Sequence, residues 1–273
     1  MKKGIIIIGI LMAWLLLIGG VVSLLIAATA KRKVLKNSSL IIAIDYSEGM
    51  YFVDTTDIKS QLLDIGFSKL TELEIEKLNL TKAEKHLERL PFVADAQLYV
   101  GRTGKLHIDI KQKKPILRIY NTDNLSFYVD KKFNKIPCSK KFTAHVPLLL
   151  NAPSGLADYI DTKDTALFRQ VCNMALHIAT SEFWCAQVDE IIWNNNNTFT
   201  IIPNLGNHII ELGSCTDYAP KLHKLELFYA KNMSKKSMWD KYESLNVTFN
   251  NQIVCKYKKY NNYESTDTTS APH

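Results

Sequence analysis

The side chains suited to catalysis or metal binding are scattered along the chain rather than grouped. Among its 273 residues it has seven histidines, which are His86, His107, His145, His177, His208, His223 and His273. None is spaced as H-E-x-x-H or as a zinc-binding pair, and the sequence has no G-x-S-x-G, S-x-x-K, P-loop or G-x-G-x-x-G motif. We therefore expect a protein that is not an enzyme and that has no catalytic residue, metal site or cofactor.

The thiols and the one adjacent pair of carboxylates lead to the same expectation. The chain has five cysteines and no C-x-x-C, and they are Cys138, Cys172, Cys185, Cys215 and Cys255. Their odd number leaves at least one thiol unpaired within a monomer. One or two disulfides could form in an oxidising compartment, but small buried thiols are the simpler interpretation. Asp189 and Glu190 are neighbours, so on a strand they point to opposite faces and cannot act together.

The basic charge of the chain is concentrated near its N-terminus. The net charge is +7, but +1 remains for residues 37–273 once Lys2, Lys3 and the four basic residues at 31–36 are set aside. This argues against a nucleic-acid-binding face. Residues 4–30 have no charge at all, and about 20 such residues span a bilayer. Since signal-peptide cores run only about 7–15 residues, we expect an uncleaved transmembrane helix at 4–30 after a short stub at 1–3. The basic residues on the two sides of this helix are nearly balanced, so charge alone does not settle which side faces the cytoplasm.

A small domain is expected next, over residues 38–115. The segment 40–46 alternates in the manner of a strand, and a first helix begins at Asp54 or Thr55 and ends at Gly66.

A second helix is predicted from the capping-box pattern of Thr81 and Glu84, and Pro91 ends it. Two alternating strands, 93–100 and 105–111, follow around a glycine-flanked turn. In the first of them the residues expected to face the core are Ala94, Ala96, Leu98 and Val100. The order strand, helix, helix, strand, strand places two helices on one face of a small sheet, whose other face and edge stay open to a partner.

The remainder, residues 116–257, is expected to form a larger mixed β domain with flanking helices, so the fold class is α+β. Strands are predicted at 116–121, 126–130, 146–150, 186–193, 198–202 and 208–212, and helices from about Asp161 to Ile178 and over 218–232. In the last two alternating segments, Leu245, Val247 and Phe249 share one face of the first, and Ile253, Cys255 and Tyr257 share one face of the second. The polar residues 258–273 are expected to be disordered.

Three stretches, 75–119, 126–150 and 221–256, together resemble the FtsQ/DivIB family of bacterial cell-division proteins. The first contains "LPFVADA" at 90–96 and "QKKP" at 112–115, which resemble the end of a POTRA domain. The order and spacing of these stretches carry the resemblance. The chain departs from the family at 246–249, where Asn, Val, Thr and Phe stand in place of a frequent D-L-R-Y.

The resemblance implies a POTRA domain at 38–115, a β domain at 116–257 and no catalysis. It implies a single-pass inner-membrane protein at the division septum, with a cytoplasmic N-terminus and the bulk of the chain in the periplasm. Its partners would be FtsB-like and FtsL-like bitopic coiled-coil proteins and the septal peptidoglycan synthesis machinery. A partner strand would be added at the C-terminal edge strand, which gives the partner-binding residues as Leu245, Val247, Phe249, Ile253, Cys255 and Tyr257.

Three alternatives remain open from the sequence. The chain could be a POTRA-bearing factor for outer-membrane protein assembly or secretion, although such proteins usually repeat the POTRA unit or add a barrel. It could be a membrane-anchored hydrolase with a dispersed site, which would need a deep pocket with convergent ionisable groups. Phe249 could also belong to the core rather than to an interface.

Overall fold

The computed structural model describes residues 12, 14–24, 36–37, 40–67, 73–74, 79–102, 105–156, 166–232 and 239–258. The chain divides into two compact units, residues 1–113 and residues 114–273. Each unit has its own hydrophobic core.

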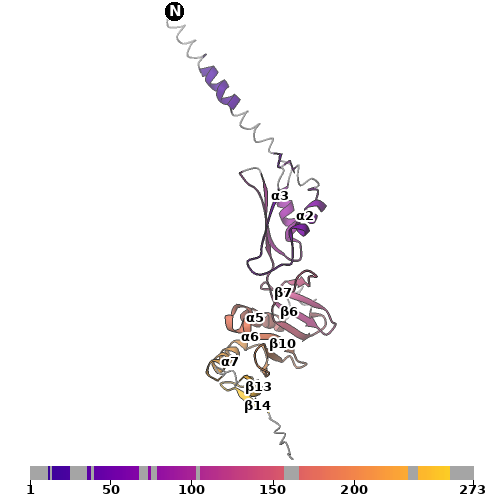
Figure 1. The fold of residues 1–273 in the computed structure, drawn as a ribbon, viewed down its shortest axis with the longest axis vertical. Coiled ribbons are helices and arrows are strands. Elements are labelled where there is room, and N and C mark those ends of the chain that lie inside the picture. The colour runs from indigo at the N-terminus through magenta and orange to yellow at the C-terminus, as the bar shows by residue number, and fades with distance from the viewer. Residues whose placement is uncertain are drawn as a thin grey trace, which may run out of the picture. The chain divides into compact units, whose positions relative to one another are not determined.

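The first unit is a three-stranded sheet covered by two helices (Figure 1). Its elements are β1 (Lys36–Asn37), β2 (Leu40–Asp45), α2 (Thr55–Asp64), β3 (Leu73–Glu74), α3 (Leu80–Glu88), β4 (Val93–Val100) and β5 (Leu106–Gln112). The sheet has the order β2-β5-β4, with β2 parallel and β4 antiparallel to β5, and β1 pairs with β3 separately. The predicted order strand, helix, helix, strand, strand is confirmed.

The two helices begin in different ways. The prediction for α2 is confirmed, since Asp54 caps it and exchanges hydrogen bonds with Asp57 in a capping box. The predicted cap at Thr81 is wrong, because α3 begins earlier and Asn79 caps it by accepting from the Lys82 amide at 2.9 Å. Glu84 instead accepts from the backbone amide of Leu98 in β4 at 2.8 Å. Because Asn79 caps the helix, Thr81 lies within its first turn and is no longer at the capping position.

A register shift at the start of β4 alters which residues face the core. The pairing of β4 with β5 shifts between Val93 and Asp95, so Val93 is buried and Ala94 is exposed. The expectation that Ala94 faces the core is therefore wrong, while Ala96 and Leu98 are buried as expected. A bulge of this kind adds one residue to one strand and reverses the alternation on one side of it.

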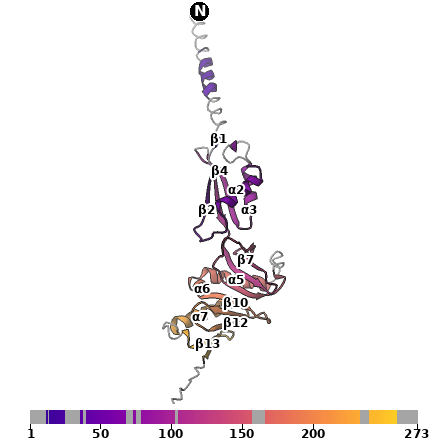
Figure 2. The same cartoon turned by 45° about the vertical axis from the view of Figure 1, so that its right-hand side comes forward.

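The second unit is built on a nine-stranded sheet (Figures 1 and 2). Its strands are β6 (Pro115–Asn121), β7 (Ser126–Asp130), β8 (Lys135–Pro137), β9 (Leu148–Ala152), β10 (Val188–Trp193), β11 (Phe199–Pro203), β12 (Ile209–Gly213), β13 (Tyr242–Asn246) and β14 (Val254–Tyr257). They lie in the order β14-β13-β12-β11-β10-β9-β6-β7-β8. Strand β9 is parallel to both of its neighbours, and β12 is parallel to β13. Strand β8, which is only three residues long, was not predicted from the sequence.

Three helices cover this sheet, namely α5 (Ala166–Thr180), α6 (Glu182–Gln187) and α7 (Tyr218–Asn232). The apolar stripe predicted for α5 is confirmed, because Val171, Met174 and Ile178 are fully buried. In α7, Leu222 and Leu225 are buried in the same core. The short helix α6 was not predicted, and the residues proposed to begin α5, around Asp161, lie outside the described part of the chain.

The N-terminal segment is described only in part. Of the predicted transmembrane helix at 4–30, residues 12 and 14–24 are described, and these are helical. In the part of the chain that the structure describes, no helix is both long enough and apolar enough to cross a bilayer. The predicted stub at 1–3 lies outside the described residues, as do residues 259–273 of the predicted disordered tail. The first residue of that predicted tail, Lys258, is instead ordered, since its amide donates to the Lys241 carbonyl.

Candidate protein-binding edge of the large sheet

Strand β14 forms one end of the nine-stranded sheet and pairs on one side with β13. The pairing is antiparallel, with Cys255 opposite Leu245 and Tyr257 opposite Tyr242. The Lys258 amide extends the pairing by donating to the Lys241 carbonyl at 3.1 Å. Among the described residues no strand pairs with the other side of β14, which is therefore an edge. An edge strand is a template for pairing with another chain.

The alternation of an antiparallel ladder identifies the backbone groups that face this edge. Along a strand, each residue directs its amide and carbonyl groups to the side opposite to that of the preceding residue. The register shift in this pair, between Tyr242 and Ser244, places the extra residue on β13, so the alternation along β14 is regular. Since Lys258 bonds toward β13, the backbone groups of Cys255 and Tyr257 point toward the edge.

The six residues predicted for partner binding fall into two groups. Leu245 in β13 and Val247 just after it are fully buried in the core, where they support β13, the strand that pairs with β14. Phe249 is 50% exposed and lies beyond the end of β13, so the alternative that places Phe249 in the core is wrong.

The three predicted residues on the β14 side become more exposed toward the end of the strand. Ile253 and Cys255 are partly buried and pack against the core, whereas Tyr257 is 55% exposed. The Tyr257 ring lies 5.1 Å from that of Tyr242, and the Lys241 ammonium lies 5.3 Å from its centre. Burial raises the pKa of the Cys255 thiol, which keeps it protonated and apolar. The face of β14 that continues the core is thus an apolar surface that a further strand could extend.

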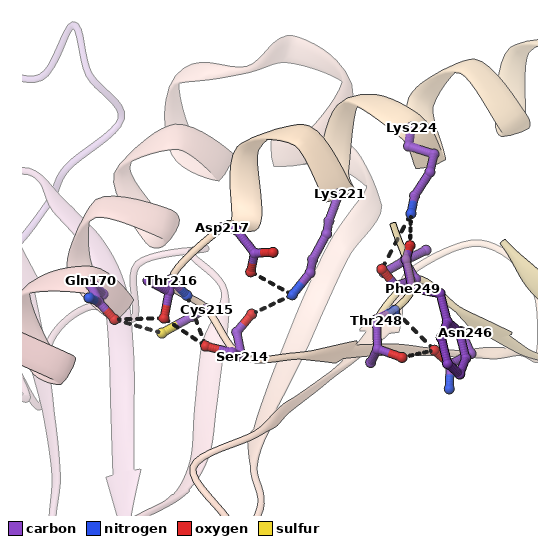
Figure 3. A network of polar contacts seen from close by, with 11 residues as sticks. Gln170, Ser214, Cys215, Thr216, Asp217, Lys221, Lys224, Asn246, Thr248 and Phe249 are labelled. Carbon is purple, nitrogen blue, oxygen red and sulfur yellow. Dashed lines mark hydrogen bonds and ion pairs between the residues drawn. The ribbon is translucent and has the colours of Figure 1, made fainter. Parts of the chain in front are cut away.

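The connection between β13 and β14 is held by polar contacts that the sequence analysis did not predict (Figure 3). Asn246 accepts from both the amide and the hydroxyl of Thr248, at 3.0 and 2.6 Å, and donates to the Glu211 carboxylate at 2.6 Å. Thr248 packs over Gly213, where an added Cβ would lie 2.7 Å from its methyl group. A signal was present in the sequence, since asparagine commonly bonds to the backbone two residues further on.

The opposite end of the sheet, β8, is built differently. The Asp130 amide donates to the Asn134 carbonyl at 3.0 Å, and the pairs continue regularly to Phe127 opposite Pro137. By the same alternation, Lys135 and Pro137 direct their backbone groups to the open edge. Proline has no N–H group there. A short edge strand that contains lysine and proline is a common protection against strand addition.

Side chains that could act in catalysis or bind a metal do not cluster at β14 or elsewhere in the described part of the chain. Within the described residues, no group of three or more His, Cys, Asp or Glu side chains could hold a metal ion. Burial raises the pKa of the Cys172 thiol, and it raises that of Cys215 to about 11, which makes both poor nucleophiles. Asp189 is exposed on β10 and Glu190 is half-buried.

Two further features, a buried histidine and a shallow pocket, contain ionisable groups. His208 is buried, with its Nε2 atom 2.7 Å from the Tyr229 hydroxyl. A shallow pocket of about 260 Å³ lies on the open face of the small sheet, lined in part by Asp45, Asp95 and Asp109. It is a groove across three strands rather than a deep pocket of the kind that the hydrolase alternative requires.

The arrangement defines a class of protein: a small two-helix sheet domain followed by a β domain with one protected edge and one open C-terminal edge. Comparison with known families agrees with this organisation. Residues 36–111 match the POTRA-like domain, and residues 114–256 match the family described as FtsQ/DivIB, C-terminal related. The second match covers more than half of the chain, which therefore belongs to that family. No curated protein gave a match.

Membership in this family bears on function at a general level. The FtsQ/DivIB family is generally non-catalytic, its domains are those of a cell-division scaffold, and its members have protein partners in the division complex. These statements agree with the sequence-based resemblance to an FtsQ/DivIB-type protein, which is confirmed.

Proposed function

We propose that the chain is a non-catalytic scaffold of the bacterial division complex, and that it binds a partner by adding the partner's strand to β14. The observation that carries this proposal is the contrast between the two ends of the sheet. At β14 the amides of Cys255 and Tyr257 face the edge beside apolar side chains, whereas Pro137 removes the corresponding donor at β8. Backbone bonds to an added strand provide affinity, and side chains at alternate positions provide specificity.

The six predicted residues take different parts in this proposal. Phe249 and Tyr257 are exposed and would touch the partner directly, with Ile253 and Cys255 beneath the added strand. Leu245 and Val247 would act only by supporting β13 from the core. Aromatic residues dominate many protein interfaces because a large apolar surface is buried with few rotatable bonds.

The partners that we propose are FtsB-like and FtsL-like bitopic coiled-coil proteins, through which the scaffold would help control the septal peptidoglycan synthesis machinery. Family membership supports division-complex partners in general. We further propose that residues 4–30 anchor the protein in the inner membrane, with residues 1–3 in the cytoplasm and the bulk of the chain in the periplasm at the septum. The uncharged stretch supports this location. A reporter enzyme that is active only in the cytoplasm, fused after His273, should be inactive. Activity would contradict the proposed location.

Photo-crosslinking in living cells tests the binding edge. A photoreactive phenylalanine analogue replaces Tyr257 in one full-length variant and Lys135 in a matched variant, so that each end of the sheet carries one probe. We expect position 257 to crosslink to a small single-span membrane protein and position 135 not to do so. Equal crosslinking at both positions, or none at 257, would contradict strand addition at β14.

A depletion experiment tests the cellular role separately. Cells that lose the chain should continue to grow but fail to divide, and so form filaments. Cells that divide normally without it would show that the scaffold role is wrong.

A further inference from the structure

The side chain of Lys224, on α7, reaches the connection between β13 and β14 (Figure 3). Its ammonium group donates to the carbonyl oxygens of Phe249 at 2.7 Å, Gln252 at 2.9 Å and Val247 at 3.4 Å. These three acceptors span the whole connection, so one side chain from a helix fixes a loop that lies between two strands.

The number of contacts matches the chemistry of the group. A lysine ammonium has three donor hydrogens and no acceptor, and here three carbonyl oxygens lie around it. Bonds from a charged donor are stronger than those between neutral groups. No carboxylate in the described part of the chain pairs with Lys224, whereas Lys221, one turn earlier, pairs with Asp217 at 2.7 Å. Lys224 therefore binds the loop, whereas Lys221 stabilises the start of α7.

The helix that carries Lys224 is itself firmly placed. Leu222 and Leu225, which flank it in sequence, are both fully buried in the core of the β domain. At the other side of the loop, Asn246 is bonded to Thr248 and Glu211. The loop is thus held at its start by Asn246 and along its length by Lys224.

We propose that Lys224 is a positioning residue for partner binding at β14. It holds Phe249 in its exposed position and sets the point at which β14 begins, so that the edge is ordered before a partner strand arrives. An interface that is ordered in advance avoids the entropic cost of ordering it during binding. This inference rests on the proposed function of the β14 edge, and it adds that a residue outside that edge controls how tightly the edge binds.

The test uses three variants of the full-length chain. Lys224→Met removes the ammonium group but keeps a side chain of similar length. Lys224→Arg keeps the charge, but no single nitrogen of its planar guanidinium can donate to three carbonyl oxygens, as the lysine ammonium does. Lys231→Met is the matched control, because it removes an exposed lysine from the last turn of the same helix.

Two measurements are made on each variant. Hydrogen–deuterium exchange of purified protein reports on the loop amides at 248–252 and on the amide of Leu245 within β13. Crosslinking from position 257 in cells reports on partner binding. For Lys224→Met we expect faster exchange in the loop, unchanged exchange at Leu245 and a fall of about tenfold in partner binding, a typical effect of lost pre-organisation. Lys224→Arg should be intermediate, and Lys231→Met should match the wild type.

The outcomes separate this inference from the proposed function. Unchanged loop exchange in Lys224→Met would overturn the role of Lys224 in the loop. Faster loop exchange with unchanged crosslinking would overturn its role in binding and leave the β14 edge intact. If the wild-type chain gives no crosslink at position 257, the proposed function itself fails, and the positioning role fails with it. A change at Leu245 would show damage to the β domain, and this too would overturn a role confined to the loop.

Discussion

At one end of the nine-stranded sheet, Cys255 and Tyr257 present backbone amides to the open edge; at the other end, the equivalent place is occupied by Pro137. The two end strands also differ in burial: Ile136 within β8 is fully buried, whereas the residues of β14 are exposed or partly buried and the fully buried Leu245 belongs to the neighbouring β13. The clearest difference lies in the backbone donors that the two edges direct outward. Because exposed edges are usually protected in monomeric proteins, this contrast is the basis of the proposal that β14 pairs with a partner strand.

The largest expected effect tests whether both ends belong to one folded unit. Leu245→Ala and Ile136→Ala should each lower the free energy of unfolding by about 2–5 kcal/mol, the usual cost of truncating a buried aliphatic side chain. Chemical unfolding followed by the fluorescence of the buried Trp184 and Trp193 would measure this. If Leu245→Ala has little effect while Ile136→Ala is costly, the β14 end is not part of the cooperative core.

The next largest effect is expected when proline, which protects the β8 edge, is introduced into β14. Cys255→Pro removes an outward amide while leaving the bonds between β14 and β13 in place, because an edge strand tolerates proline where its N–H faces outward. An unsatisfied group in the interface costs about 1–3 kcal/mol, so partner crosslinking should fall by about 5- to 150-fold. Cys255→Ala, which keeps the amide, is the control and should bind almost normally. Equal binding by both variants would mean that this amide is not used.

A smaller effect is expected from the reverse change at β8. The double variant Lys135→Thr with Pro137→Val restores an outward amide and removes a charge from that edge. Since cross-strand contacts are worth about 0.2–1 kcal/mol each, we expect weak self-association that appears only at high protein concentration. Sedimentation velocity over a range of concentrations would measure it. A chain that stays monomeric throughout would show that proline and lysine are not what protects β8.

The smallest effect concerns the pH dependence of stability in the half of the sheet that ends at β14. There His208, just before β12, contacts Tyr229 of α7. Burial lowers the pKa of His208, and Lys258 adds to this, while Asp240 and the Trp239 backbone oppose it. Because the folded-state pKa lies below that of the unfolded chain, near 6.5, the unfolded state binds more protons as the pH falls below that value. Stability should therefore decrease from about pH 6.5 downward and stay constant above it.

Hydrogen exchange can separate the two ends in this experiment. Exchange should increase in β12 and α7 on acidification before it increases in β7 and β8. His208→Gln, which cannot gain a proton in this range, should remove the difference. An unchanged difference in this variant would assign the pH effect to other groups.

Regular alternation and helical spacing predicted most of the fold, because they record directly which face of each element is buried. The stripe of Val171, Met174 and Ile178 located α5, and the alternation of Leu106, Ile108 and Ile110 located β5. Predictions failed where the chain departs from regularity. The bulge at Val93 reversed one face of β4, and Asn79 took the capping position expected for Thr81.

The candidate edge was only partly predictable for a similar reason. The apolar alternation of Ile253, Cys255 and Tyr257 indicated a strand, but the place of that strand in the sheet depends on pairings between distant segments. The contact between Lys224 and the carbonyl of Gln252 joins residues that are 28 positions apart. No local pattern distinguishes Lys224 from the other lysines on α7, so its role became visible only in the folded chain.

The parallel pairings of the large sheet also imply an order of events during folding. The groups β6-β7-β8 and β10-β11-β12 each join neighbours in sequence, but β9 can unite them only after β10 has formed, and β13 can join β12 only after α7 has crossed over. Non-local pairings of this kind form slowly. Strand β14 is the last described strand in chain order, so during synthesis the β14 edge cannot form until residue 257 has been made. A chain that ends before β14 lacks the proposed binding edge.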